Sequence, residues 1–133
     1  MNYLLDTHTF IWAVAEPKKL PGKVVAILEE PASHVAVSAV SFWEIAMKAR
    51  RKTLDLGGLK TIDLFGKALA MNLELISVDD EESASIEDLL ERSHYDPFDR
   101  MLVWQAIRRN LTLLSADATL KRFEKDGLRL LWK

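Results

Sequence analysis

The chain has 133 residues with 18 basic and 20 acidic side chains, so its formal net charge of -2 neither indicates nor excludes a polyanionic partner. It contains no cysteine, which excludes disulfides and thiolate metal sites and leaves Asp and Glu as the ligands for a hard cation. No apolar stretch approaches the roughly 18 residues that a membrane span requires, and the N-terminus lacks the pattern of a signal peptide. We therefore expect one cytoplasmic domain over residues 1–133, without a membrane partner.

Strand and helix patterns alternate through the first half of the chain. In order, they predict a strand over Tyr3–Leu5, a helix from Thr7 that Pro17 ends, a helix from Leu20–Gly22 to about Pro31, a strand over His34–Val37, and a helix that closes at Arg50–Lys52. Either Ser38 or Ser41 can cap this last helix, and Ser41 with Glu44 has the spacing of a capping box.

The second half continues the alternation after a glycine-containing loop at 53–59. The patterns predict a helix over Ile62–Met71, a strand over Leu73–Ser77, a helix over Asp79–Leu90, a helix from Pro97 to Arg109, a strand over Leu111–Leu114, a short helix from Ser115, and a strand over Leu128–Trp132. Such alternation places parallel strands in one sheet with helices on both faces. We therefore predict an α/β fold with a central parallel sheet of four to five strands.

Acidic residues follow two of these predicted strands. Asp6 comes directly after the first strand, and Asp117 follows the strand at 111–114. Because the carboxyl ends of parallel strands meet at one edge of a sheet, these carboxylates are expected to converge there. Helix capping remains open for each acid, and it explains Asp96 well, since Pro97 and Asp99 follow it in the order of a capped helix start.

A shared cleft for Asp6, Glu44, Asp99 and Asp117 would require a counter-charge. Two like charges about 4 Å apart repel by on the order of 4 kcal/mol at an effective dielectric near 20. A divalent cation removes that repulsion, and Mg²⁺ or Mn²⁺ is typically held by one or two carboxylates together with waters. Such a site suits hydrolysis of phosphodiester bonds.

Four sequence blocks support this interpretation: Leu4–His8, Val37–Ile45, Asp96–Arg100 and Leu114–Asp117. In this order, and with the helix Met101–Arg109 after the third block, they resemble the PIN-domain family, and more narrowly its VapC-type toxins. The resemblance spans nearly the whole chain. It implies a three-layer α/β/α nuclease domain over 1–133 that cuts RNA with Mg²⁺ or Mn²⁺, forms a homodimer, and acts as the toxin of a type II toxin-antitoxin pair with a cognate antitoxin.

The resemblance also implies roles for particular residues. Asp6 and Asp99 would be the principal metal ligands, Glu44 would bind the metal directly or through water, and Asp117 would complete the cluster. Asp96 matches the family's acid-Pro-Phe-Asp-Arg block and is placed after the other four among the catalytic residues, because capping also explains it. The hypothesis is an in-line attack on phosphorus by a water that a carboxylate orients, with no histidine as base.

Basic and aromatic residues remain open to two interpretations each. The run Arg50–Lys52 with Lys48, and the weaker pair Lys121–Arg122, are either solvated helix ends or phosphate contacts. We interpret His34 and His94 as structural. Trp12, Trp43 and Trp104 are expected to pack in the core or an interface rather than stack on bases. We interpret five acids in and just after the predicted helix at 79–90 as a solvated helix face, namely Glu81, Glu82, Glu87, Asp88 and Glu91.

Two other function classes compete with the nuclease. A catalytically silent α/β module that binds RNA or protein would keep its acids for capping. A phosphatase or phosphotransfer receiver domain lacks support, because no Asp-x-Asp pair follows the first strand. Apolar helix residues are candidates for a dimer or antitoxin surface, namely Trp12, Val14, Phe42 and Ile45.

Overall fold

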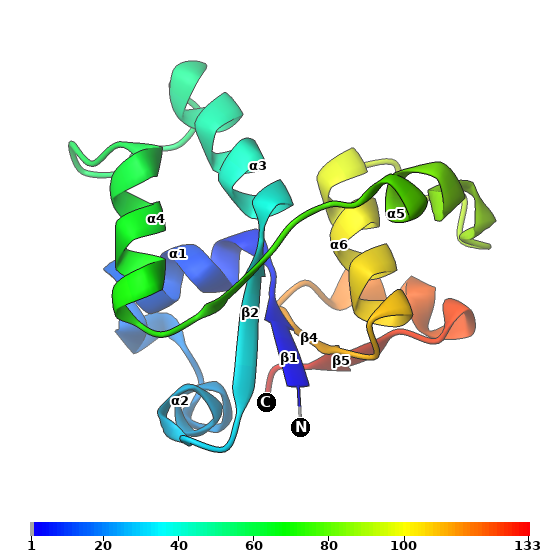
Figure 1. The fold of residues 1–133 in the computed structure, drawn as a ribbon, viewed down its shortest axis with the longest axis horizontal. Helices are drawn as coiled ribbons and strands as arrows, with labels where there is room; N and C mark the ends of the chain where they lie inside the picture. Colours follow the sequence, from blue (N-terminus) through cyan, green and yellow to red (C-terminus); the bar gives the residue numbers. More distant parts are fainter. Residues whose placement is uncertain (1) are drawn as a thin grey trace.

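A five-stranded, all-parallel sheet lies at the centre of the computed structural model, which describes residues 2–133 (Figure 1). Its strands are β1 (Asn2–Leu5), β2 (His34–Ser38), β3 (Glu74–Ile76), β4 (Thr112–Leu114) and β5 (Arg129–Leu131). They are arranged in the order β3-β2-β1-β4-β5. The predicted α/β fold is confirmed, with each predicted strand present.

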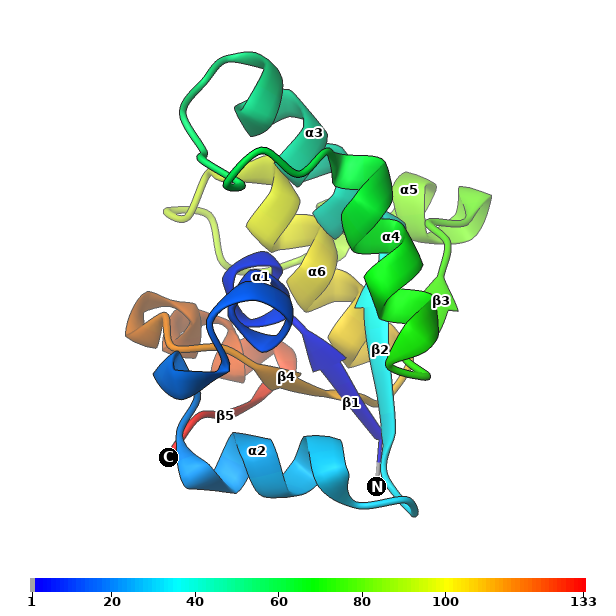
Figure 2. The ribbon, with the colours of Figure 1, turned by 90° about the vertical axis from the view of Figure 1, so that its left-hand side faces the viewer.

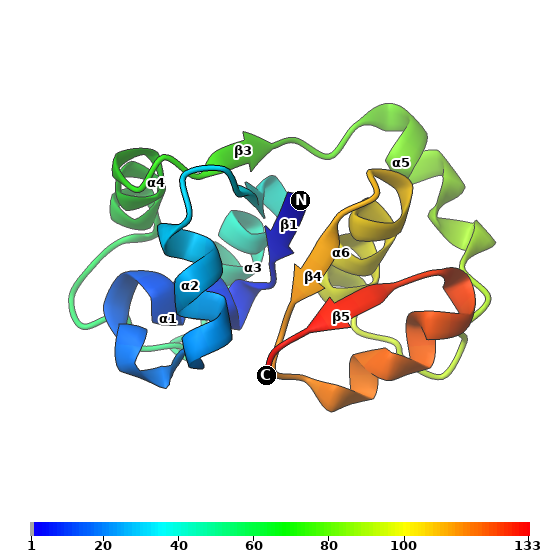
Figure 3. The ribbon, with the colours of Figure 1, turned by 90° about the horizontal axis from the view of Figure 1, so that it is seen from below.

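Helices cover both faces of this sheet. They are α1 (Thr7–Ala15), α2 (Gly22–Glu29), α3 (Ala39–Arg50), α4 (Thr61–Ala70), α5 (Asp80–Ser85) and α6 (Pro97–Arg108), with 3-10 segments η1 (Pro17–Lys19), η2 (Ile86–Asp88) and η3 (Ala118–Asp126). Figure 3 shows α1, α2 and α4 on one side of the strands and α5, α6 and η3 on the other. In the part of the chain that the structure describes, none of these helices has the length and apolar character to cross a membrane.

Alternate side chains of each strand supply a separate hydrophobic core on each face. Leu5 packs with Phe10 of α1 on one face, whereas Leu4 packs with Leu102 of α6 and Phe123 of η3 on the other, and all five side chains are fully buried or nearly so. Burying a Leu or Phe side chain is worth about 1.5–3 kcal/mol. The two cores therefore fix the sheet between its helix layers.

The chain changes direction across the sheet between β1 and β4. It runs outward from β1 through β2 to β3, and then returns to the other side of β1 to form β4 and β5. Leu5 pairs with Leu114 at the carboxyl ends of these neighbouring strands, and the Asp6 N–H donates to the Leu114 carbonyl at 3.2 Å. Open parallel sheets build their sites at such a switch point. Helix α3 lies at this end of the sheet and α2 at the opposite end (Figure 2).

Helix α3 begins after Ser38, the first of its two predicted caps, and not at Ser41. Ser38 is its N-cap and accepts a hydrogen bond from the Val40 N–H at 3.1 Å. The predicted capping box at Ser41 is wrong, because Ser41 lies inside the helix with its side chain buried. Its hydroxyl lies 3.0 Å from the Thr7 hydroxyl of α1, so it ties two helices together.

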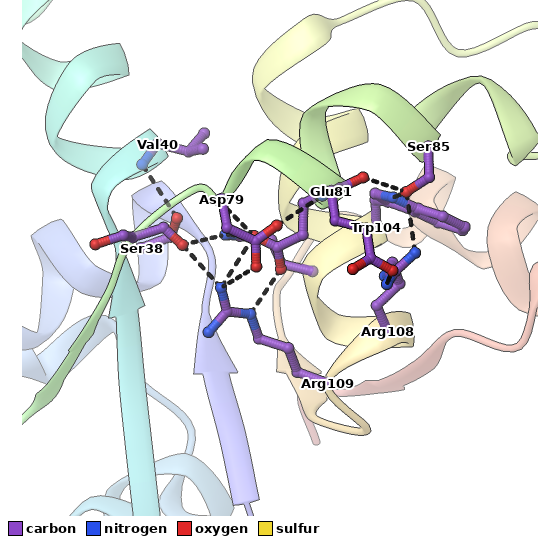
Figure 4. Close-up of polar contacts among 11 residues, drawn as sticks. Ser38, Val40, Asp79, Glu81, Ser85, Trp104, Arg108 and Arg109 are labelled. Carbon is purple, nitrogen blue, oxygen red and sulfur yellow. Dashed lines mark hydrogen bonds and ion pairs between the residues drawn. The ribbon is translucent and has the colours of Figure 1, made fainter.

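The predicted solvated acidic face is confirmed in part, because Glu81, Glu87 and Asp88 are exposed, but it is wrong for Glu82 and Glu91, which are buried. Glu82 is 2% exposed, and the Arg109 guanidinium donates to both of its carboxylate oxygens, at 2.6 and 2.9 Å. Burial acts to raise the pKa of Glu82, but hydrogen bonds from Arg109, the Asp79 N–H and Gln105 outweigh it and hold the pKa at about 2. Figure 4 shows Arg109 reaching from the end of α6 toward the start of α5. This network holds the two helices together.

Candidate catalytic cleft

All five acids singled out in the sequence line one cleft of about 410 Å³. The carboxylates come from four separate segments: Asp6 after β1, Glu44 in α3, Asp96 and Asp99 at the start of α6, and Asp117 after β4. Residues more than 100 positions apart in the sequence are thus brought together at the switch point of the sheet. The remaining lining includes His8, Trp12, Lys48 and Ala116.

Asp6 lies at the point where β1 ends and α1 begins. Its side chain is the N-cap of α1 and accepts a hydrogen bond from the Thr9 N–H at 2.8 Å. Burial is the largest influence on Asp6 and raises its pKa, although hydrogen bonds with Ser115 and Thr9 oppose the shift. Asp6 is therefore held firmly in place while its negative charge remains poorly solvated.

Glu44 is held by two neighbours on different helices. It is 4% exposed, and the Thr7 hydroxyl donates to its Oε1 at 2.6 Å. Lys48, one turn later on α3, forms an ion pair with Oε2. Lys48 thus turns into the cleft and does not belong with the exposed Arg50–Lys52 run in which the sequence placed it. The hydroxyl and the ammonium together fix the orientation of this carboxylate.

Asp96 and Asp99 lie together on the first turn of α6. The predicted capping role of Asp96 is confirmed, since its Oδ1 accepts the Asp99 N–H at 2.9 Å. Asp99 Oδ2 lies 2.9 Å from His94 Nε2. Burial is the main cause that raises the pKa of Asp99, and the charges of Asp96 and Glu44 add to it while His94 opposes it.

Asp117 is the most exposed of the five acids and lies at the start of η3. Its Oδ1 accepts hydrogen bonds from the Thr119 N–H at 2.9 Å and from the Thr119 hydroxyl at 2.6 Å. Ser115 lies between this acid and Asp6, because its hydroxyl accepts the Asp117 N–H at 3.1 Å and also hydrogen bonds to Asp6. The two strand-end acids are therefore linked through one buried serine.

The cleft carries an excess of negative charge. Its described lining holds five carboxylates but one lysine and one histidine, Lys48 and His8. Among residues 2–133, no group of three or more acidic or histidine side chains is arranged closely enough to hold a metal ion. The donor set still fits Mg²⁺ or Mn²⁺ chemically, because all of these oxygens are hard carboxylate ligands.

Two residues that contact the cleft acids, Lys48 and His94, have a different role from the one that the sequence predicted. The sequence does contain a signal for the ion pair of Lys48 with Glu44, because Lys48 stands four positions after Glu44 on the same helix face. His94 was interpreted as structural, and its contact with Asp99 depends on the turn before α6, which Arg100 fixes by donating to the carbonyls of Glu91 and His94 at 2.8 and 3.0 Å. For Thr7 the sequence leaves open whether its hydroxyl caps a helix, contacts phosphate or orients a carboxylate, and the structure shows it donating to Glu44, 37 positions away.

Comparison with known proteins shows to which family this chain belongs. The model of the PIN domain matches residues 3–126. The chain belongs to the PIN domain family. Among curated proteins of this type, it is similar to ribonuclease VapC22 of Mycobacterium tuberculosis, with 27% identity over 118 residues that cover 89% of this chain and 88% of the relative.

Solved structures share the fold of this PIN domain at lower identity. The structure of VapBC2 from Rickettsia felis, bound to a DNA fragment from its promoter, contains a chain with a TM-score of 0.74 and 19% identity, and all of both chains is covered. FitAcB from Neisseria gonorrhoeae gives a TM-score of 0.62 and 22% identity over 98% of this chain and 96% of that one. The three-layer arrangement of this chain is therefore shared with these two structures.

Proposed function

We propose that this PIN domain is a metal-dependent endoribonuclease that hydrolyses RNA phosphodiester bonds in the carboxylate cleft. The observation that carries the proposal is the convergence of Asp6, Glu44, Asp96, Asp99 and Asp117 at the switch point of the sheet. Membership of the PIN family supports a divalent cation there, and similarity to a protein named a ribonuclease supports RNA as the substrate.

Four carboxylates are suited to hold Mg²⁺ or Mn²⁺, namely Asp6, Glu44, Asp99 and Asp117. When bound, such a cation makes water more acidic and offsets the negative charge of the phosphate. The residues that touch these acids keep them oriented: Thr7 holds Glu44, His94 holds Asp99, and the α1 N-terminus holds Asp6. Partners of this kind normally preserve ligand geometry.

The chain's own groups also position the attacking water. Asp6 and Asp99 are hydrogen-bond acceptors in a half-buried cleft, where acceptors can align a water toward phosphorus. Asp96 keeps α6 in register through its cap, which places Asp99. Asp96 therefore contributes mainly by positioning Asp99.

The test is to incubate the purified protein with total RNA in Mg²⁺, in Mn²⁺ or in chelator, and to map the ends of the fragments. We expect cleavage with either cation and none in chelator. The D99N variant should be inactive, whereas an E82Q variant, changed in the α5–α6 network, should still cut. Cleavage that resists chelator, or a fully active D99N variant, would overturn the proposal.

A second candidate is a catalytically silent module that binds RNA or protein. It is favoured by the fact that Asp6, Asp96 and Asp117 each cap a helix and that Lys48 neutralises Glu44. The same incubation separates the two functions, because a silent module would bind RNA and leave it intact with either cation.

We also propose that the protein is the toxin of a toxin-antitoxin pair. Similar chains crystallised in VapBC and FitAB structures, which supports a small protein partner. Of the apolar residues predicted for such a surface, Ile45 is fully buried in the core and is excluded. Helix α4 offers a better surface, because Ile62 and Leu69 are 68% and 52% exposed on it. The predicted homodimer, like the predicted cytoplasmic location, stays a prediction.

The partner surface can be tested with the purified toxin and a cognate antitoxin that protects cells from it. An I62E/L69E variant should keep RNA cleavage but lose inhibition by the antitoxin, since two charges replace apolar contacts. Unchanged inhibition would exclude α4 as the docking surface. Light scattering of the unmodified chain alone tests the homodimer.

A further inference from the structure

A second groove opens beside the carboxylate cleft, with a volume of about 390 Å³. Its lining includes Ala116, which also lines the cleft, so the two cavities adjoin. The groove lies between η3 and the end of the chain after β5, and Figure 3 shows that end between α1 and η3. The proposed hydrolysis does not use it.

Two tryptophans form the wall that joins the two cavities. Trp12 of α1 lines the carboxylate cleft and Trp132 lines the second groove. Their ring centroids are 5.8 Å apart with an angle of 50° between the planes. Both side chains are partly exposed, although each also packs against the core. An aromatic surface therefore continues from the acids into the groove.

The charge of the lining changes sign along this surface. The cleft carries the five acids, whereas the described lining of the groove contains Lys121 and Lys133 and no acidic residue. Arg122, the neighbour of Lys121 in the sequence, reaches instead toward Ser93 at 3.4 Å. Of this basic pair, Lys121 is thus the member that faces the groove.

An aromatic wall with two cations suits one kind of ligand. Indole rings stack on nucleobases of any sequence, and lysines attract phosphates, which is how proteins hold single-stranded nucleic acids. The acidic cleft needs a cation before it can accept a phosphate, but the groove offers its own positive charge. A strand with its scissile phosphate in the cleft would reach the groove with its next nucleotide.

We propose that this groove binds the nucleotide of single-stranded RNA adjacent to the scissile phosphate. Its base stacks on Trp132, and its phosphate contacts Lys121 and Lys133. The proposal rests on the proposed ribonuclease function and adds a specific subsite to it. The site gives the enzyme a preference for unpaired RNA, because a base within a duplex is not free to stack on an indole.

The experiment measures binding without cleavage. The D99N variant is titrated into a labelled single-stranded RNA of mixed sequence, and affinity is read by fluorescence anisotropy at several salt concentrations. Adding W132L, which keeps an apolar side chain but removes the aromatic face, should weaken binding about 5-fold or more. Adding W132F, which retains an aromatic face, should stay within roughly threefold of the D99N parent.

Charge variants test the lysines separately. Adding K121A/K133A should weaken binding and reduce the slope of log affinity against log salt by about 0.7, since both lysines contact one phosphate and each neutralised phosphate of a single strand contributes about 0.7. The matched control K67A, on α4, should change neither affinity nor slope. Circular dichroism confirms that each variant is folded.

The outcomes distinguish this proposal from the proposed function. If adding W132L or K121A/K133A leaves RNA affinity equal to that of the D99N parent, the subsite is overturned and the groove is left to a protein partner. If instead the unmodified enzyme cuts no RNA while its RNA affinity still depends on Trp132, the subsite stands and the catalytic proposal fails.

Discussion

Two groups of acidic side chains in this PIN domain have opposite electrostatic surroundings. Glu82 faces the Arg109 guanidinium at 2.6 and 2.9 Å, and these donors hold its pKa at about 2. In the carboxylate cleft, burial raises the pKa of both Asp6 and Asp99. Buried carboxylates thus carry a well compensated charge in one region and a poorly compensated charge in the other.

This contrast separates the acids that stabilise the fold from those that are available for chemistry. A buried carboxylate with all of its donors in the protein needs nothing further, and removing a partner only destabilises the fold. A cluster whose charge is not compensated by the protein favours a cation from outside. Glu82 is therefore an internal control for the cleft acids. Each prediction changes either Glu82 or a residue of the cleft site.

The largest effect is expected when Asp99 is replaced by Asn. RNA cleavage should fall by about 100-fold or more, because a divalent cation contributes several kcal/mol to catalysis. The thermal midpoint should not fall, since the raised pKa means that the charge of Asp99 opposes folding. Cleavage rates and thermal unfolding of the same preparation check both parts. A variant that loses its fold along with its activity would contradict the contrast with Glu82.

Replacing Glu82 by Gln should have the reverse result, with lower stability and with RNA cleavage retained. The pKa is lowered from 4.5 to about 2, so the carboxylate stabilises the fold by on the order of 3 kcal/mol at neutral pH. That contribution is complete above about pH 4.5 and is lost as the pH falls toward 2, so the unmodified chain and E82Q should converge there. Urea unfolding across this pH range measures the difference in free energy of unfolding between the two proteins. If that difference stayed constant at all pH values, the ion pair with Arg109 would not be the source of the stability.

A smaller effect is expected at Thr7, which orients Glu44. The T7V variant keeps the shape of the side chain but removes the hydroxyl 2.6 Å from Oε1, and cation affinity should fall by roughly tenfold. T7S retains the hydroxyl and should restore most of the affinity. Titration calorimetry with Mn²⁺ makes the comparison. Equal loss in T7V and T7S would point to packing rather than to orientation.

The smallest effect is expected at Asp96. Asparagine caps helices about as well as aspartate, so the D96N variant should retain α6 and lose less than about tenfold in cleavage. A loss equal to that of D99N would place Asp96 among the metal ligands and not only at the cap. Cleavage rates at saturating Mg²⁺ decide between these roles.

The sequence predicted the fold and the location of the cleft through local patterns. Asp6 and Asp117 were recognised because each follows an apolar strand, and parallel strands bring such ends together. Pro97 after Asp96 marked the start of α6 correctly. These features depend on short stretches of chain, which is why the amino-acid sequence alone predicts them.

Contacts between distant segments could not be predicted in the same way. Glu82 looked solvated because its partner, Arg109, lies 27 positions away on another helix. Ser41 had the spacing of a cap, but the helix begins three residues earlier at Ser38, where the hydroxyl already satisfies the free N–H. Trp132 lies in the wall between the groove and the cleft through its contact with Trp12 across the fold. For Glu82 and Trp132, packing between distant segments outweighs the local signal.

If the cleft acids, and not the acids of α5, bind the divalent cation, changing them should abolish Mn²⁺ binding. Titration calorimetry with Mn²⁺ compares the unmodified chain with the E82Q, D6N and D99N variants. We expect the unmodified chain and E82Q to bind Mn²⁺ with the same affinity, and both Asp variants to lose binding. Undiminished binding in D6N and D99N, or its loss in a folded E82Q variant, would contradict this expectation.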